Sequence, residues 1–189
     1  DGVIGQMMEK VEIRPTKPRR TEEEIRALCD SWATIGKPAH RGGNTITSLA
    51  LEADVQERHN IKLQKKYAEI EANEARYSTY KTEDAEHLIV AFGCMSRIGE
   101  AVVDYAREQG YKVGLLRPIT LFPYPTAAVE ALIPQLKSIM SVELNAGQMV
   151  SDLKVIANGR VPVNFYGRQG GMIPDPEEVF EAFVKSINK

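Results

Sequence analysis

The feature that most constrains the fold of this chain is a regular alternation of short apolar runs and amphipathic helical segments after residue 84. Continuous apolar runs of this length are typical of strands covered on both faces, and apolar residues at every third or fourth position indicate helices between them. Four strands are expected, at residues 88–92, 113–116, 139–144 and 161–166. Because strands that alternate with helices pair in parallel through right-handed crossovers, we predict an α/β fold with three α/β/α layers and a mostly parallel sheet.

Capping residues and prolines indicate where the helices of this part begin and end. Ser96 is expected to cap the helix that follows the first strand, and Gly110 is expected to end it. Pro134 is expected to interrupt a helix over residues 127–137, and residues 175–178 (DPEE) are predicted to cap the last helix. The inner face of the first of these helices is predicted to carry Ile98, Ala101, Val102, Tyr105 and Ala106.

The first part of the chain is less regular and is predicted to be a mostly helical extension. Residues 14–20 (RPTKPRR) combine prolines with basic side chains, which indicates an exposed linker. Thr21 and Glu24 form the capping-box pattern of a short helix. Residues 53–80 are polar with one narrow apolar stripe, which predicts a long helix docked on a neighbour.

Composition excludes several classes of protein. The chain has 24 Lys and Arg against 26 Asp and Glu, a net charge of -2, and so lacks the basic excess of a nucleic-acid binder. No apolar stretch approaches the ~20 residues of a membrane span, and no signal-peptide pattern is present. The two cysteines, Cys29 and Cys94, are far apart, which favours a reducing, cytoplasmic location and predicts no iron–sulfur cluster built by this chain alone. The three scattered histidines predict no metal site.

The loops after the predicted strands are where ligands and partners would meet such a sheet. These loops, which together we call the rim, contain the polar side chains Arg97, Arg117, Glu143, Asn145, Gln148, Arg168 and Gln169. They contain neither a G-x-G-x-x-G pattern nor a P-loop, so no nucleotide cradle is predicted. The aromatic–proline run at residues 121–125 (LFPYP) is rigid and partly apolar, which suits a turn or a docking surface for another domain or subunit.

Two features of this rim have more than one interpretation. Arg117 and Glu143 end consecutive strands, so they could orient a carboxylate substrate and move a proton, or form an ion pair that joins two loops. Charge pairs of this kind are mostly not catalytic, which favours the structural role. Cys94 lies beside a helix N-terminus, where a thiol can become reactive, but no histidine accompanies it and a packed thiol is favoured.

At these loops the sequence resembles the alpha subunit of 2-oxoacid:ferredoxin oxidoreductases. The resemblance rests on VAFGCMSRIGEAV, KVGLLRPITLFPYP, VELNAGQMVSDL and VPVNFYGRQGGMIPDPEEV. Residues 1–12 look like the end of that subunit's preceding pyrimidine-binding domain, so the start at Asp1 is expected to be a boundary inside a longer subunit. Trp32, Ala33 and residues 41–49 (RGGNTITSL) resemble the 2-ketoisovalerate type more than the 2-oxoglutarate type.

The resemblance implies a multi-subunit enzyme that uses thiamine diphosphate and Mg. Such enzymes decarboxylate a 2-oxoacid, pass electrons through iron–sulfur clusters to ferredoxin, and form an acyl-coenzyme A. It also implies beta and gamma/delta-type subunits as partners, and no nucleic acid or membrane. Residues 1–20 would then be the end of the preceding pyrimidine-binding domain and a linker. Residues 21–83 would be a mostly helical connecting segment, and residues 84–189 would form a transketolase C-terminal-like domain.

In that setting the rim is expected to serve domain and subunit assembly. No catalytic, cofactor-binding or metal-binding residue is assigned to this chain, because the family holds its cofactors elsewhere. The candidate interface consists of Arg97, Arg117, Tyr124, Glu143, Asn145 and Gln148.

Three questions stay open at the level of sequence. Transketolase-type C-terminal domains usually have five strands with the first antiparallel, and either residues 77–81 (YSTYK) or residues 45–49 (TITSL) could supply the missing edge. The chain could also be the matching domain of another thiamine enzyme, such as a transketolase or a 2-oxoacid dehydrogenase beta chain. A free-standing small-molecule binder that uses Arg97, Arg117 and Glu143 is the third possibility.

Overall fold

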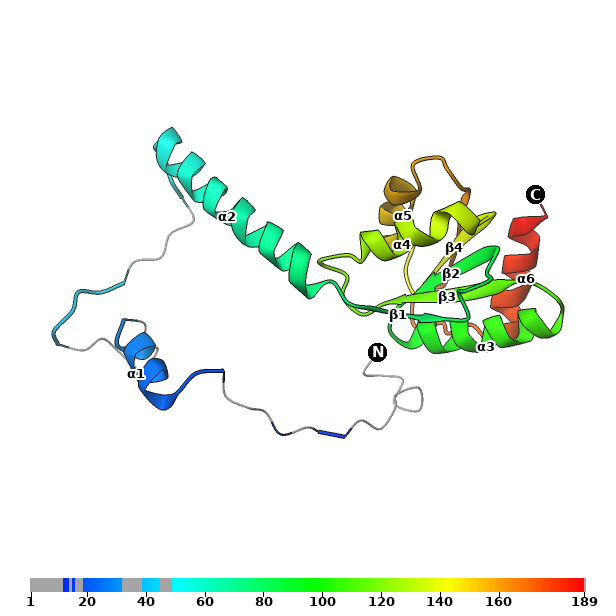
Figure 1. Ribbon diagram of the computed structural model, residues 1–189, viewed down its shortest axis with the longest axis horizontal. Coiled ribbons are helices and arrows are strands. Elements are labelled where there is room, and N and C mark those ends of the chain that lie inside the picture. Colours follow the sequence, from blue (N-terminus) through cyan, green and yellow to red (C-terminus); the bar gives the residue numbers. More distant parts are fainter. Residues whose placement is uncertain (1–11, 14, 16–18, 32–38, 45–48, 189) are drawn as a thin grey trace. The chain divides into compact units, whose positions relative to one another are not determined.

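The computed structural model describes all residues except 1–11, 14, 16–18, 32–38, 45–48 and 189 (Figure 1). Its described residues separate into two compact units, with the boundary between Gln64 and Lys65. Helix α1 (Glu22–Ser31) belongs to the first unit, and helix α2 (Ala53–Glu74) begins in the first unit and ends in the second. No helix among the described residues is long and apolar enough to cross a membrane.

The start of α1 confirms the predicted capping box. The Thr21 backbone amide donates to Glu24 Oε2 at 2.8 Å, and the Glu24 amide donates to Thr21 Oγ1 at 3.2 Å. Each residue thereby satisfies a backbone donor that the first helical turn leaves free. The other features predicted in this part, the linker at 14–20 and the run at 45–49, lie partly or mostly outside the described residues.

The second unit contains a five-stranded sheet in the order β1-β3-β2-β4-β5. Its strands are β1 (Tyr77–Tyr80), β2 (His87–Ala91), β3 (Val113–Pro118), β4 (Ser138–Glu143) and β5 (Val163–Gly167). Strand β1 runs antiparallel to β3, and the other neighbours pair in parallel. The predicted mostly parallel sheet is confirmed, and residues 77–80 supply the fifth strand at its edge.

This edge strand corrects the predicted long helix, which ends at Glu74 and not at residue 80. Immediately after the helix, the Arg76 carbonyl accepts a hydrogen bond from the Ile119 amide at 2.9 Å. Tyr77 then pairs with Pro118 in the antiparallel register. Without β1, strand β3 would leave its backbone N–H and C=O groups unpaired at the sheet edge. Pairing with these groups makes residues 77–80 a strand, although their side-chain pattern also suits a helix.

Helices cover both faces of the sheet, as the three-layer prediction required (Figure 1). Helices α3 (Cys94–Glu108) and α6 (Pro176–Ile187) pack on one face, in a core that includes Ile89, Val102, Leu115, Val142 and Phe183. Helix α4 (Thr126–Leu132), the 3-10 turn η2 (Ile133–Gln135) and helix α5 (Met149–Ala157) cover the other face, around Leu88, Leu116, Val129, Ile139 and Leu153. Each of these fully buried side chains contributes roughly 1.5–3 kcal/mol.

Several helix details differ from the sequence prediction. Ser96 is not the N-cap of α3, because the helix begins at Cys94 after Gly93, whose φ of 58° suits glycine. Ser96 lies inside the first turn and its hydroxyl donates to the Gly93 carbonyl at 2.7 Å. On the same helix, Ala101 and Tyr105 are exposed and Val103 is buried in their place.

The caps of the later helices follow the prediction more closely. Pro134 ends regular α-helix, because α4 stops at Leu132 and continues only as the short η2 turn. The Asp175 carboxylate accepts a hydrogen bond from the Glu178 amide at 2.8 Å, which confirms the predicted cap of α6.

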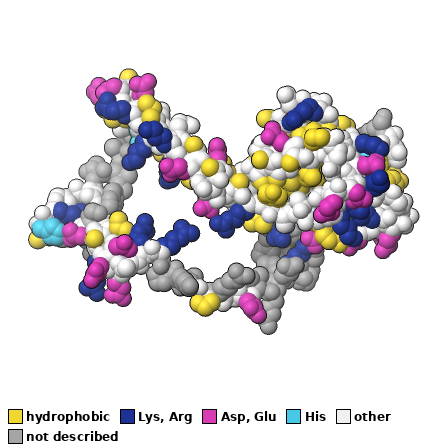
Figure 2. Space-filling view, viewed as in Figure 1, with side chains coloured by type: hydrophobic (Ala, Val, Ile, Leu, Met, Phe, Trp, Pro, Cys, Tyr) yellow, Lys and Arg dark blue, Asp and Glu magenta, His cyan; other side chains and the backbone are white. Residues whose placement is uncertain are grey.

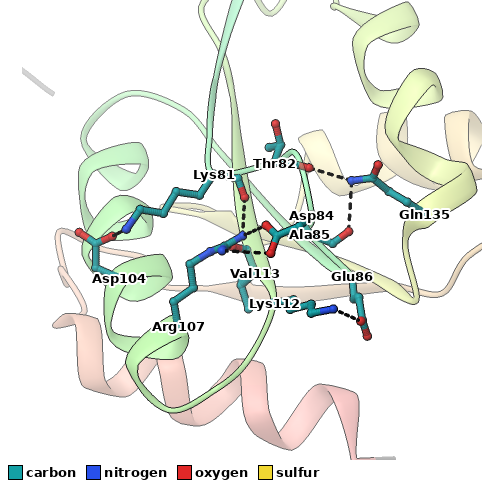
Figure 3. A network of polar contacts seen from close by, with 10 residues as sticks. All are labelled: Lys81, Thr82, Asp84, Ala85, Glu86, Asp104, Arg107, Lys112, Val113 and Gln135. Atoms are coloured by element: carbon teal, nitrogen blue, oxygen red, sulfur yellow. Dashed lines mark hydrogen bonds and ion pairs between the residues drawn. The ribbon is translucent and has the colours of Figure 1, made fainter.

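A polar network at the amino ends of the strands holds the turn between β1 and β2 (Figure 3). The Arg107 guanidinium donates to the Lys81 carbonyl at 2.8 Å, to the Asp84 carboxylate at 2.6 Å and to the Val113 carbonyl at 2.7 Å. This pairing lowers the pKa of the Asp84 carboxyl. From the other side of the turn, the Gln135 amide donates to the Thr82 carbonyl at 2.7 Å. The network therefore fixes the reversal that brings the antiparallel edge strand into the sheet.

Candidate domain and subunit interface

The structure places the six residues of the candidate interface along the carboxyl end of the sheet. Neighbouring strands β2 and β4 lead into helices on opposite faces, which makes the space between them a topological switch point. Arg97, on α3, lies on one side of this point, and Asn145 and Gln148, before α5, lie on the other. Arg117 and Tyr124 belong to β3 and the loop after it, one strand further along.

Glu143 is a structural anchor of α5. Its side chain is buried, with 1% of its surface exposed, at the last position of β4. The backbone amides of Gln148, Met149 and Val150 donate to the carboxylate at 3.1, 2.9 and 2.9 Å, and the Ser141 hydroxyl donates at 2.8 Å. The carboxylate therefore takes up the free donors of the first turn of α5 and lies at the positive end of that helix.

This environment also sets the charge of Glu143. Burial alone would raise the pKa of its carboxyl, but the hydrogen bonds from Ser141 and from the three α5 amides outweigh burial and lower the pKa below its usual value of about 4.5. A carboxyl held ionised in this way does not donate a proton near neutral pH. The sequence suggested an ion pair between Glu143 and Arg117, but the Glu143 carboxylate bonds to these four donors instead. Strand β2 lies between β3, which carries Arg117, and β4, which carries Glu143.

The pH dependence of stability follows from this pKa. Because the folded pKa is lowered, ionised Glu143 stabilises the fold above the ordinary glutamate pKa, and the contribution is lost as pH falls through the folded pKa. We expect the stability difference between the protein and Glu143→Gln to be largest near pH 7 and to shrink steadily below about pH 4.5. Urea unfolding midpoints of both proteins between pH 7 and pH 3 measure this, and a difference that does not change with pH would contradict the assignment.

Asn145 shapes the loop between β4 and α5. Its side-chain oxygen accepts a hydrogen bond from the Gly147 amide at 2.7 Å, and Gly147 has a φ of 102°, which favours glycine. The Asn145 carbonyl also lies so close to Gly167 on β5 that a Cβ at Gly167 would approach it to 2.4 Å. Asn145 thus holds its own loop, whereas the Gln148 side chain is exposed beside it.

Tyr124 presents an unusual buried hydroxyl. Among the described residues it is the one buried side-chain polar atom without a hydrogen-bond partner. Burial, reinforced by the nearby charges of Asp152 and Glu143, raises the pKa of the Tyr124 phenol, so it stays protonated. The ring itself packs against the core on the α4 and α5 face.

Removing this hydroxyl is expected to leave the protein as stable or slightly more stable. An unsatisfied buried polar group costs roughly 1–3 kcal/mol, so Tyr124→Phe should raise the free energy of unfolding by up to about 1 kcal/mol once the altered packing is included. Thermal unfolding of the variant measures the change. A loss of more than about 1 kcal/mol would show that the hydroxyl has a bonding partner in the folded protein.

At the level of sequence, one feature of the rim was missed and a second was predicted only for residues 121–125. The first is a cluster in which Glu178 of α6 accepts hydrogen bonds from the Tyr166 hydroxyl and from Arg168, both at 2.5 Å. Burial and the Glu178 carboxylate raise the pKa of Tyr166 to about 12. This cluster joins the loop after β5 to α6, and the pattern DPEE signalled only the helix cap.

The second feature is a set of large apolar side chains exposed on the carboxyl-end loops. They follow β3 and β5, and they are Ile119, Leu121, Phe122, Met172 and Ile173, each between 43% and 65% exposed. Cys94, by contrast, is buried at the start of α3, as the packed-thiol interpretation predicted. No group of three or more His, Cys, Asp or Glu in the described part of the chain could hold a metal ion.

Comparison with known proteins identifies the family. The sequence profile of "Pyruvate:ferredoxin oxidoreductase core domain II" matches residues 85–179. The ketoisovalerate oxidoreductase subunit VorB of Methanothermobacter thermautotrophicus is 40% identical over 182 residues, which are 96% of this chain and 49% of VorB. This chain therefore spans about half the length of that curated relative.

Solved structures support the same fold. The 2-oxoglutarate:ferredoxin oxidoreductase from Magnetococcus marinus superimposes with a TM-score of 0.63 at 18% identity, over 80% of this chain and 28% of that one. A split-gene transketolase matches with a TM-score of 0.51 at 15% identity, over 60% of this chain and 41% of that one. The strand order and the sequence match together show that this chain belongs to the pyruvate:ferredoxin oxidoreductase core domain II family and has a transketolase C-terminal-like fold.

Proposed function

We propose that this chain is part of the alpha subunit of a thiamine-diphosphate-dependent 2-oxoacid:ferredoxin oxidoreductase, with 2-ketoisovalerate as its 2-oxoacid. The observation that carries the proposal is the 40% identity to a ketoisovalerate oxidoreductase subunit along 96% of the chain. In the proposed reaction, the 2-oxoacid loses carbon dioxide, its two electrons reduce ferredoxin, and its acyl group is joined to coenzyme A. The proposed partners are the beta and gamma/delta-type subunits and ferredoxin, in the cytoplasm.

Within that enzyme we assign this chain an assembly role. On its carboxyl-end rim Glu143 and Asn145 are committed to holding loops and helices, while apolar side chains such as Phe122 and Met172 face outward. Exposed apolar groups gathered on loops are typical of surfaces that meet another protein. As part of this proposal, residues 1–20 end the preceding domain, residues 21–83 connect it, and residues 84–189 form the assembly domain.

The start of α5 does not fit the diphosphate group of thiamine diphosphate. A diphosphate bound at α5 would need the backbone amides that Glu143 already occupies, and the anionic Glu143 would repel it. In the part of the chain that the structure describes, no group of three or more His, Cys, Asp or Glu could hold a metal ion by itself. We therefore derive no catalytic step from these residues and propose that other parts of the enzyme hold the cofactors.

Turnover by the complete enzyme tests the proposal. The full-length subunit, produced with its partner subunits, should reduce ferredoxin only when 2-ketoisovalerate and coenzyme A are both present. We expect kcat/KM for 2-ketoisovalerate to exceed that for 2-oxoglutarate and pyruvate by about tenfold or more, the effect of roughly 1.4 kcal/mol in the transition state. A preference for 2-oxoglutarate or pyruvate would contradict the assigned substrate.

A separate measurement tests the assembly role. The 189-residue chain alone should show no turnover, and its unfolding temperature should not rise with thiamine diphosphate and Mg, coenzyme A or 2-oxoacids. Ligands that bind only the folded state stabilise it, so a clear upward shift with one of these compounds would assign a binding site to this chain and overturn the assembly role.

A further inference from the structure

A groove lies where α2 joins the α/β unit. It has a volume of about 620 Å³ and is lined by the last turn of α2, by Tyr77 and by residues 122–128. Figure 2 shows hydrophobic side chains gathered on the α/β unit. Phe122, which lines the groove, is 65% exposed, and its sequence neighbour Leu121 is 50% exposed. We call this feature the α2–α4 groove.

The two walls of the groove are fixed to each other. The Arg76 amide donates to Thr120 Oγ1 at 2.9 Å, and the Ile119 amide donates to the Arg76 carbonyl at 2.9 Å. In addition, the rings of Tyr67 on α2 and Phe122 meet edge to face, with 6.2 Å between their centroids. A groove held in this way needs little rearrangement to receive a partner, which lowers the cost of binding.

The lining defines the chemistry of an occupant. Its lining includes the small side chains of Ala72, Ala75, Ala127 and Ala128 and the aromatic ring of Tyr77, which is 49% exposed. One carboxylate, that of Glu71, lies on the α2 wall, and within the described part of the chain no hydrogen bond or ion pair engages it. The last turn of α2 contains no basic residue, and the Arg76 guanidinium just after the helix pairs with Glu74 at 2.9 Å, not with Glu71. The groove therefore suits an apolar side chain next to a lysine or arginine.

We propose that the α2–α4 groove receives a segment of the remaining half of the same subunit, one that presents an apolar side chain beside a basic residue. This inference rests on the proposed function, because a curated relative is about twice as long as this chain. A tethered segment also meets the groove at a high effective concentration, which favours it over a separate chain of equal chemistry.

Photo-crosslinking in the assembled enzyme tests this. The photoreactive amino acid p-benzoylphenylalanine is placed at Phe122 of the full-length subunit, and mass spectrometry locates its adducts. We expect an adduct to a peptide of the other half of the same subunit, with a lysine or arginine within a few residues. Glu71→Lys should reduce its yield by about tenfold, as expected when a favourable charge pair becomes a repulsive one. The matched control Glu108→Lys, at the exposed end of α3, should leave the yield unchanged.

Each other outcome overturns the inference. Adducts to a different subunit, to a second copy or only to residues 1–189 would exclude the proposed occupant, and an undiminished yield in Glu71→Lys would exclude the charge recognition. Placing the same photoreactive residue at Val155, which is 77% exposed on α5, controls for non-specific reaction. Ferredoxin reduction is measured on the same samples. An inactive complex that gives the expected adduct would refute the proposed function alone, and an active complex without it would refute only this inference.

Discussion

Replacing Glu143 by alanine is expected to lower the free energy of unfolding by about 3–5 kcal/mol, because several hydrogen bonds to a charged acceptor, each worth roughly 1.5–3 kcal/mol, are lost together. The substitution leaves the Ser141 hydroxyl and three α5 amides without their acceptor in a buried site. Unmet buried donors lose their solvation without compensation. Urea unfolding at pH 7, followed by circular dichroism, measures the loss.

Two variants make this result specific. Glu143→Gln keeps one acceptor oxygen and a similar volume, so its loss should be smaller than that of the alanine variant. Glu108→Ala removes an exposed carboxylate at the end of α3 and should change stability by no more than about 0.5 kcal/mol. A cost below about 1 kcal/mol for Glu143→Ala would show that the carboxylate does not anchor α5.

Replacing Gly114 by alanine is expected to cost about 2–4 kcal/mol, because the new methyl group would collide with backbone. A Cβ at this position of β3 would lie 2.7 Å from the Lys81 carbonyl oxygen and 2.9 Å from the Thr82 Cα. The Lys81 carbonyl is itself held by Arg107, so the turn that joins β1 to β2 has little freedom to move away. Thermal and urea unfolding of the variant measure the cost.

A glycine in open space provides the control for this experiment. A Cβ at Gly42 meets no atom within 4 Å, so Gly42→Ala should be neutral to within about 0.5 kcal/mol. If Gly114→Ala were equally neutral, the turn at residues 81–86 would have to shift without cost, and the network around Arg107 would not be rigid.

The elements that the sequence predicted best are those whose signals are local. Strand β2 and helix α6 are each set by side chains a few positions apart: a continuous apolar run in the first, and a cap followed by a periodic apolar face in the second. Strand β1 is different, because its four residues are mostly exposed and become a strand only by pairing with β3. Its local pattern matched the preceding helix equally well, and so the predicted helix was too long.

The candidate interface shows the same division. The sequence correctly placed Glu143 and Asn145 at the end of a strand, where functional groups of α/β proteins gather. It did not reveal that the backbone amides at the start of α5 would donate hydrogen bonds to the Glu143 carboxylate. Nor did it reveal that β2 would separate Glu143 from Arg117, because order in a sheet depends on where each crossover takes the chain.

The sequence by itself thus determined the α/β class, the family resemblance and most helix and strand positions, since these depend on periodicity and capping within short segments. Only the tertiary structure decided the strand order, the anchoring role of Glu143 and the α2–α4 groove. These features join residues far apart in the chain, such as Gln135 with Thr82 or Ile119 with Arg76. The physical reason is that hydrogen bonding and close packing between distant segments depend on the path of the whole chain, which local side-chain patterns do not encode.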